Sequence, residues 1–196
     1  MSKQIEFFFD VGSPASYLAW TQLPAIAERT GAEVVYRPML LGGVFHAIGN
    51  RPPGSVEAKG NYTRRDFARF AERYGVTLNH NPYFPINTLQ LMRGAEAYLG
   101  TDRFQPYLAA VFKGMWRDEL DMAQPDVAIR VLAEAGFDPT ELQAKLGDQA
   151  VKDGLKATTE EAVRRGVFGA PTFFVGDEMF FGQDRLEWVE AELAKG

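Results

Sequence analysis

The sequence predicts an α/β fold in which a β-α-β unit and a β-β-α unit are separated by a large helical insertion. Three observations support this prediction. Short apolar runs at residues 5–9 and 34–36 flank a segment with helical periodicity. Two further runs, at residues 172–175 and 178–181, precede a last amphipathic segment. Between these two units, glycine and proline divide a long series of helical patterns.

The 196 residues are enough for one compact domain that carries a large insertion. We expect residues 1–40 and 167–196 to form one discontinuous domain, and residues 41–166 to form the helical insertion. No internal repeat or low-complexity tract interrupts this organisation.

The first helix is expected to begin directly after the first strand. Ser13 is a favourable N-cap residue, and Pro14 fits the first helical position. Apolar residues then recur at helical spacing as far as Gly31, which suits a C-cap. A strand at residues 33–37, before Pro38, completes the unit, and the helix between the two strands makes them parallel.

The insertion is predicted to consist of helices that are divided by glycines and by looser stretches at residues 49–54 and 79–87. The expected helices are residues 61–74, 88–99, 102–116, 125–135, 139–146 and 148–165.

The carboxyl-terminal unit is predicted to be a β-hairpin followed by a helix. The dipeptide Gly176-Asp177 joins the two apolar runs, which favours a type II′ turn. Asp184 and Glu187 have the spacing of a capping box, which predicts a last helix that begins at Asp184. The capping box accounts for Asp184 without any ligand.

The composition excludes several classes of protein. The chain has no cysteine, so its own side chains form no disulfide, no thiolate metal site and no thiol-disulfide exchange centre. A disulfide oxidoreductase is therefore excluded. The formal net charge of -5 argues against a nucleic acid partner. His46 and His80 lie far apart without carboxylates at ligand spacing, so we expect no metal site.

The first residues predict a cytoplasmic protein that has no membrane partner. Lys3 is followed by the acidic residues Glu6 and Asp10. The apolar run between them is too short for a signal peptide or a membrane span.

The junction between the first strand and the first helix is the candidate site of chemistry. The free amides of a helix N-terminus favour a bound anion. Because the chain has no cysteine, any sulfur anion held there has to come from a bound cofactor or substrate. Taken by itself, Ser13 is better explained as an ordinary helix cap, and only the accompanying motifs favour a role in chemistry.

Four short motifs follow one another along the chain: Phe8-Phe9-Asp10-x-x-Ser13-Pro14-x-Ser16-Tyr17-Leu18, Gly49-Asn50-x-Pro52-Pro53, Val167-Phe168-Gly169-x-Pro171-Thr172 and Phe181-Gly182-x-Asp184-Arg185. In this order and spacing they resemble the 2-hydroxychromene-2-carboxylate isomerase and kappa-class glutathione transferase family. The resemblance spans nearly the whole chain and implies a thioredoxin-like fold. Redox members of that superfamily carry a Cys-x-x-Cys pair where this chain has Ser13 to Ser16.

The resemblance also implies glutathione as a cofactor, with Ser13 holding its sulfur. Ala170, before a proline expected to be cis, would pair its backbone with the tripeptide, and Gln183 and Asp184 would hold the γ-glutamyl end. Position 183 has no fixed residue type in the family pattern, since small or amide residues vary there. The full set of implied cofactor contacts is Ser13, Pro14, Ala15, Asn50, Glu57, Ala170, Pro171, Gln183 and Asp184.

The implied reaction interconverts 2-hydroxychromene-2-carboxylate and trans-o-hydroxybenzylidenepyruvate, or a related intermediate of aromatic degradation, by reversible thiolate addition. A small aromatic carboxylate substrate needs apolar walls and one or two donors. The candidates are Arg37, Tyr83, Phe84 and Trp116. The resemblance further implies a homodimer. Two alternatives stay open: a kappa-like transferase that conjugates glutathione to electrophiles, and a thiol-free module that binds an extended peptide beside the cis-proline.

Overall fold

The computed structural model describes residues 3–195, and its centre is a four-stranded mixed sheet with strand order β2-β1-β3-β4. β1 (Gln4–Phe9) pairs in parallel with β2 (Glu33–Pro38) and antiparallel with β3 (Thr172–Val175). β4 (Glu178–Phe181) pairs antiparallel with β3. The predicted β-α-β and β-β-α units are therefore confirmed, and β1 and β3 join them in one thioredoxin-like sheet.

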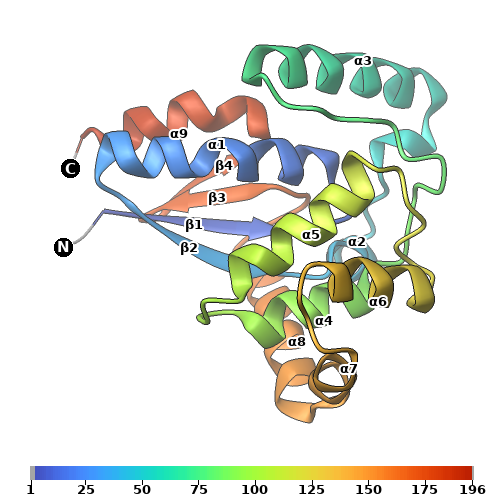
Figure 1. The fold of residues 1–196 in the computed structure, drawn as a ribbon. Helices are drawn as coiled ribbons and strands as arrows, with labels where there is room; N and C mark the ends of the chain where they lie inside the picture. The colour runs from blue at the N-terminus through green and yellow to red at the C-terminus, as the bar shows by residue number, and fades with distance from the viewer. Residues whose placement is uncertain (1–2, 196) are drawn as a thin grey trace.

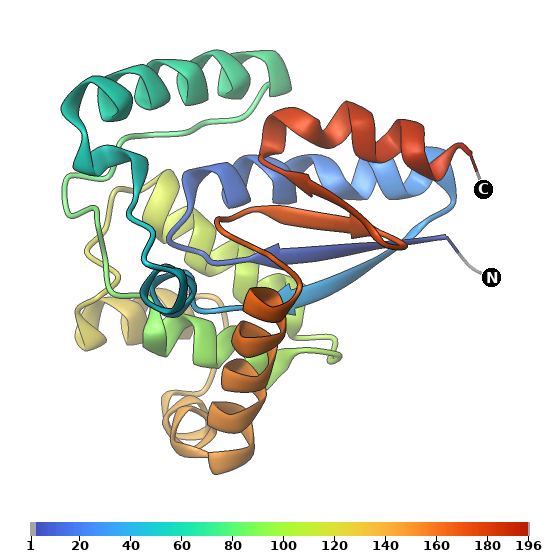
Figure 2. The same cartoon turned by 180° about the vertical axis from the view of Figure 1, so that it is seen from behind.

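Helices cover both faces of this sheet (Figure 1). α1 (Pro14–Thr30) and α9 (Leu186–Leu193) lie side by side on one face. α2 (Leu41–Ile48) and α8 (Gln149–Arg164) lie on the other, as the view from behind also shows (Figure 2). Since side chains alternate along a strand, Phe8 packs in a separate apolar cluster from its neighbours in β1.

The six helices expected in the insertion are all present, and each overlaps its predicted range. They are α3 (Glu57–Tyr74), α4 (Leu89–Tyr98), α5 (Phe104–Trp116), α6 (Pro125–Glu134), α7 (Pro139–Gly147) and α8. α3 lies apart from the other insertion helices and packs against α1 (Figures 1 and 2). None of the helices described within residues 3–195 is both long and apolar enough to cross a membrane.

Two elements within residues 41–166 were absent from the sequence-based prediction, α2 and the short 3-10 helix η1 (Pro53–Ser55). Gly42 and Gly43 weaken the helical signal at the start of α2, because glycine lowers helix propensity. A tertiary contact compensates, since the carboxylate of Asp10 accepts a hydrogen bond from the first amide of the helix, that of Leu41, at 2.8 Å.

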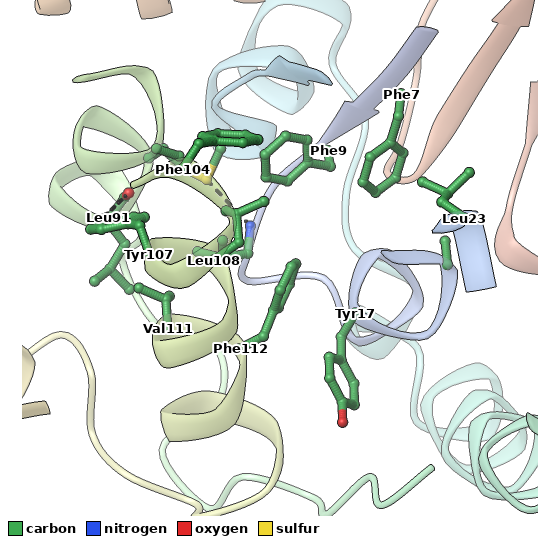
Figure 3. Close-up of a cluster of buried hydrophobic side chains, with 14 of the residues drawn as sticks. Phe7, Phe9, Tyr17, Leu23, Leu91, Phe104, Tyr107, Leu108, Val111 and Phe112 are labelled. Carbon is green, nitrogen blue, oxygen red and sulfur yellow. Dashed lines mark hydrogen bonds between the residues drawn. The ribbon is translucent and has the colours of Figure 1, made fainter. Parts of the chain in front are cut away.

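The sheet and the insertion share one hydrophobic core (Figure 3). Phe7 and Phe9, on the same face of β1, stack with ring centroids 5.0 Å apart. They lie between Leu23 of α1 and the α5 side chains Phe104 and Phe112. Because these side chains bury one another, the insertion also stabilises the sheet. The predicted boundary between domain and insertion stays a prediction.

The hairpin has the predicted turn, whereas the last helix begins differently from the prediction. Gly176 has a φ of 59°, and Asp177 is not among the described residues with positive φ, as a type II′ turn requires. The capping box is wrong. The 3-10 helix η2 (Gln183–Arg185) precedes α9, so Arg185 becomes the N-cap and Glu187 the second helical residue. Glu187 therefore cannot make the reciprocal bond.

Candidate functional site

The turn at Ser13 joins the end of β1 to the start of α1. The Ser13 backbone is extended, with φ -95° and ψ 117°, and its Oγ accepts a hydrogen bond from the Ser16 amide at 3.1 Å. The Ser13 amide in turn donates to the Asp10 carbonyl at 3.0 Å. The predicted N-cap is confirmed, and both its backbone and its side chain are held in place.

One amide of the first helical turn remains free. Pro14 has no N–H, the Ser16 amide is used by the cap, and the Tyr17 amide donates to the Ser13 carbonyl at 3.1 Å. The amide of Ala15 has no acceptor among the described residues. A helix N-terminus with a free donor is a place where an anion is stabilised.

A second segment lies against this turn. The Ser13 hydroxyl donates a hydrogen bond to the Ala170 carbonyl at 2.9 Å, although 157 positions separate the two residues. The peptide bond between Ala170 and Pro171 is cis. The first turn of α1 and the start of β3 therefore form one site.

Two further predicted positions lie beside this pair of segments. The Asn50 side-chain amide donates to the Phe168 carbonyl at 2.9 Å, which ties the loop after α2 to the chain just before Ala170. The Gly182 amide donates to the Pro171 carbonyl at 3.0 Å, which puts the buried Gln183 one residue away.

Two of the predicted cofactor contacts, Glu57 and Asp184, make no side-chain hydrogen bond to the described residues of the first turn of α1 or the start of β3. Glu57 is an exposed residue at the start of α3, and no described residue makes a hydrogen bond or ion pair with its carboxylate. The Asp184 carboxylate pairs with Arg185 at 2.6 Å. Their roles toward glutathione stay predictions.

The four predicted substrate contacts fall into two groups. Trp116 is buried and donates from its indole nitrogen to the Val11 carbonyl at 2.8 Å, directly behind the Ser13 turn. Its ring lies 5.7 Å from that of Phe84, which is partly exposed, as is Tyr83. Arg37 is engaged elsewhere, since its guanidinium pairs with Glu161 and, at 3.8 Å, with Glu6.

An exposed aromatic pair was not predicted as part of the site. The rings of Phe168 and Phe181 lie 4.5 Å apart and remain about two-fifths exposed, at 40% and 42%. Phe168 precedes Ala170 by two residues. Both residues stand in the quoted motifs, so the available signal was an aromatic residue directly before a motif glycine, Phe168 before Gly169 and Phe181 before Gly182.

Gly12 allows the Ser13 turn to approach α4 closely. A Cβ on Gly12 would lie 2.7 Å from Cγ2 of Thr88, which is too close for two carbon atoms. We therefore expect Gly12→Ala to lower the free energy of unfolding by about 1–3 kcal/mol, measured by chemical denaturation. Thr88→Ser removes the clashing methyl and keeps the hydroxyl, so the double variant should regain most of this loss. A loss that Thr88→Ser does not reduce would contradict this explanation.

Comparisons with known proteins agree with this architecture. A family model described as the DSBA-like thioredoxin domain matches residues 4–194. The 2-hydroxychromene-2-carboxylate isomerase of Sphingobium xenophagum is 32% identical over 98% of this chain and 99% of its own. Glutathione S-transferase kappa 1 of Homo sapiens is 27% identical over 95% of this chain and 89% of its own. A solved structure of a 2-hydroxychromene-2-carboxylate isomerase has a TM-score of 0.87 at 29% identity, covering 98% of this chain and 95% of that one.

Proposed function

Since the chain belongs to the 2-hydroxychromene-2-carboxylate isomerase and kappa-class glutathione transferase family, within the DsbA-like thioredoxin domains, we propose that it is a glutathione-dependent isomerase of a small aromatic carboxylate. The observation that carries the proposal is the free Ala15 amide beside the Ser13 hydroxyl, opposite cis-Pro171, in a chain without cysteine. The donors suit a sulfur anion that the protein itself does not contain.

Bound glutathione would supply a thiolate for reversible addition to an electron-poor carbon of the substrate, which would allow the former double bond to rotate. The chain's own task is to keep that sulfur ionised. A free thiol has a pKa of about 8.5, so only a few per cent is ionised at neutral pH. Lowering the pKa by about two units requires about 2.7 kcal/mol of preferential interaction with the anion.

Two groups of the site supply an interaction of this size together. A helix N-terminus contributes about 0.3–1 kcal/mol, and up to about 2 kcal/mol when partly buried. A hydrogen bond to a charged group contributes about 1.5–3 kcal/mol. The N-terminus of α1 with its Ala15 amide falls short alone, whereas the Ser13 hydroxyl in addition is sufficient.

The Ser13 hydroxyl has a single hydrogen, which it donates to the Ala170 carbonyl. For Ser13 to donate to the sulfur, this bond has to be exchanged. The Ala170 carbonyl is then available to a backbone amide of the tripeptide, the pairing that the family resemblance implies for this residue. Ser13 would thus change its acceptor, and the Ala170 carbonyl would still accept a hydrogen bond.

Substrate recognition is assigned to the exposed side chains of Tyr83 and Phe84. The buried Trp116 ring packs against Phe84. Aromatic side chains of this kind stack against a planar ring. The Arg37 guanidinium would reach a carboxylate only by leaving Glu6 and Glu161, so we rank it last among the four substrate candidates.

The test is product analysis with 2-hydroxychromene-2-carboxylate, using protein freed of glutathione and then resupplied with it. We expect the trans-o-hydroxybenzylidenepyruvate product only when glutathione is present, with no net consumption of glutathione. Thioether accumulating in proportion to the glutathione consumed would identify the kappa-like transferase instead. Turnover without glutathione would reject the proposal.

The binding-module alternative is tested by calorimetry. We expect glutathione to bind measurably to the purified chain, because the site offers donors to its sulfur and the Ala170 carbonyl to its backbone. Absent or only millimolar affinity, together with binding of an extended peptide, would favour the module.

A further inference from the structure

We propose that Asp10 is the positioning residue of the sulfur site, holding the Ser13 turn in register with the first turns of α2 and α4. This inference rests on the proposed function for its consequence, but its structural part can be tested separately. Asp10 lies at the end of β1, only 1% exposed, and no step of the proposed reaction uses its carboxylate.

Three donors from three segments converge on the Asp10 carboxylate. Oδ1 accepts from the Gly12 amide at 2.8 Å, within the loop that leads to Ser13. Oδ2 accepts from the Leu41 amide at 2.8 Å and from the Thr88 hydroxyl at 3.0 Å. Leu41 is the first residue of α2, and Thr88 is the N-cap of α4.

The backbone of Asp10 extends this network to the cap itself. Its carbonyl accepts the Ser13 amide at 3.0 Å, so the residue holds the turn by both main chain and side chain. α2 leads into the loop in which Asn50 bonds to the Phe168 carbonyl, beside the cis-proline. The buried Asp10 carboxylate therefore connects the turn that carries the Ala15 amide with the start of α2 and the start of α4.

All three partners of Asp10 donate, and this suits an ionised carboxylate, which only accepts. Burial raises the pKa of Asp10, and the bonds from Gly12, Leu41 and Thr88 act in the opposite direction. An asparagine amide has one acceptor oxygen and one donor nitrogen. Asp10→Asn therefore turns a donor toward either the Gly12 or the Leu41 amide, and that contact is lost.

The positioning role and a simple charge effect predict opposite signs. If Asp10 acted only through its negative charge, removing that charge would lower the pKa of a nearby thiol. If Asp10 positions the donors, its loss moves them out of line, and the thiol pKa rises. A purely structural role would lower stability and leave the pKa of the bound thiol unchanged.

The experiment compares Asp10→Asn with Tyr107→Phe, a matched control that removes one buried hydrogen bond, to the Leu91 carbonyl, within the α4 and α5 pair. The pKa of bound glutathione is read from thiolate absorbance, and its affinity by calorimetry. We expect Asp10→Asn to raise the thiol pKa by about one unit and to weaken glutathione binding about tenfold. Tyr107→Phe should change neither. An unchanged or lowered thiol pKa in Asp10→Asn overturns the inference.

Two further measurements address the cases in which Asp10→Asn does not fold or the wild type binds no glutathione. If Asp10→Asn does not fold, Thr88→Val removes one of the three donors and should shift the thiol pKa in the same direction by a smaller amount. The absence of a shift overturns the inference.

Amide hydrogen exchange tests the structural part of the inference without glutathione. Faster exchange at residues 11–17 and 41–44 in Asp10→Asn than in Tyr107→Phe supports positioning even if the wild type binds no glutathione, a result that would reject the proposed function alone. Equal exchange overturns the inference.

Discussion

Replacing Ser13 with alanine is expected to raise the pKa of bound glutathione by about one to two units, because a hydrogen bond worth about 1.5–3 kcal/mol to the anion is lost. At neutral pH, isomerisation should slow about three- to 25-fold, in step with the smaller thiolate fraction. Raising the pH should restore much of the rate, since the thiol then ionises without the hydroxyl. The measurements are thiolate absorbance and the pH dependence of turnover.

The chain contains a matched control for this variant. Ser16 lies three residues further along α1, and its buried Oγ has no hydrogen-bond partner among the described residues. Ser16→Ala removes the same atom from the same turn without breaking a bond, so thiol pKa and turnover should stay at wild-type values. Ser13→Ala also removes a helix cap, at a cost of about 0.5–2 kcal/mol in stability. Equal thiol pKa values in the two variants would contradict the role of Ser13.

The largest effect on stability is expected for Gly94→Ala in the middle of α4. A Cβ on Gly94 would lie 2.0 Å from the Tyr107 hydroxyl oxygen and 2.4 Å from its Cζ. Tyr107 is 1% exposed and donates to the Leu91 carbonyl at 2.8 Å (Figure 3). Its ring is packed between Tyr98 and Phe137 and cannot move aside easily.

Gly94→Ala should therefore strain the core and break a buried hydrogen bond. These effects exceed the gain of about 1 kcal/mol in helix propensity, leaving a net loss of roughly 2–4 kcal/mol in the free energy of unfolding. Gly42→Ala is the matched control in α2, because its Cβ would have no neighbour within 4 Å. It should be neutral or stabilising by up to about 1 kcal/mol. Similar denaturation midpoints for the two variants would disprove the steric explanation.

The elements that depend on local pattern were predictable from the sequence. The N-cap at Ser13 and the hairpin turn at Gly176 follow from the backbone preferences of single residues, and the insertion helices follow from a period of 3.6 residues. The missed helix α2 and the mistaken capping box at Asp184 have different causes. A tertiary contact from Asp10 supports the start of α2, whereas a short 3-10 helix directly before α9 moves its N-cap to Arg185.

From the sequence, several segments of the candidate site were predictable, whereas the bonds between them were not. The motifs and the family resemblance named Ser13, Asn50, Ala170 and Gln183, and the structure brings these segments together. Arg37 was named for its charge, which the sequence could not show to be paired with Glu161. Asp10 stood in the first motif without a role, because its partners Leu41 and Thr88 lie 31 and 78 residues away.

Composition and short-range pattern were enough to predict the β-α-β and β-β-α units, the six insertion helices from α3 to α8, the cap before α1 and the absence of cysteine. Three features came from packing alone: the Ala15 amide has no acceptor within residues 3–195, the Ser13 hydroxyl meets the Ala170 carbonyl, and Asp10 holds three segments together. The reason is physical: a hydrogen bond between residues distant in the chain forms only after packing has brought donor and acceptor within about 3 Å.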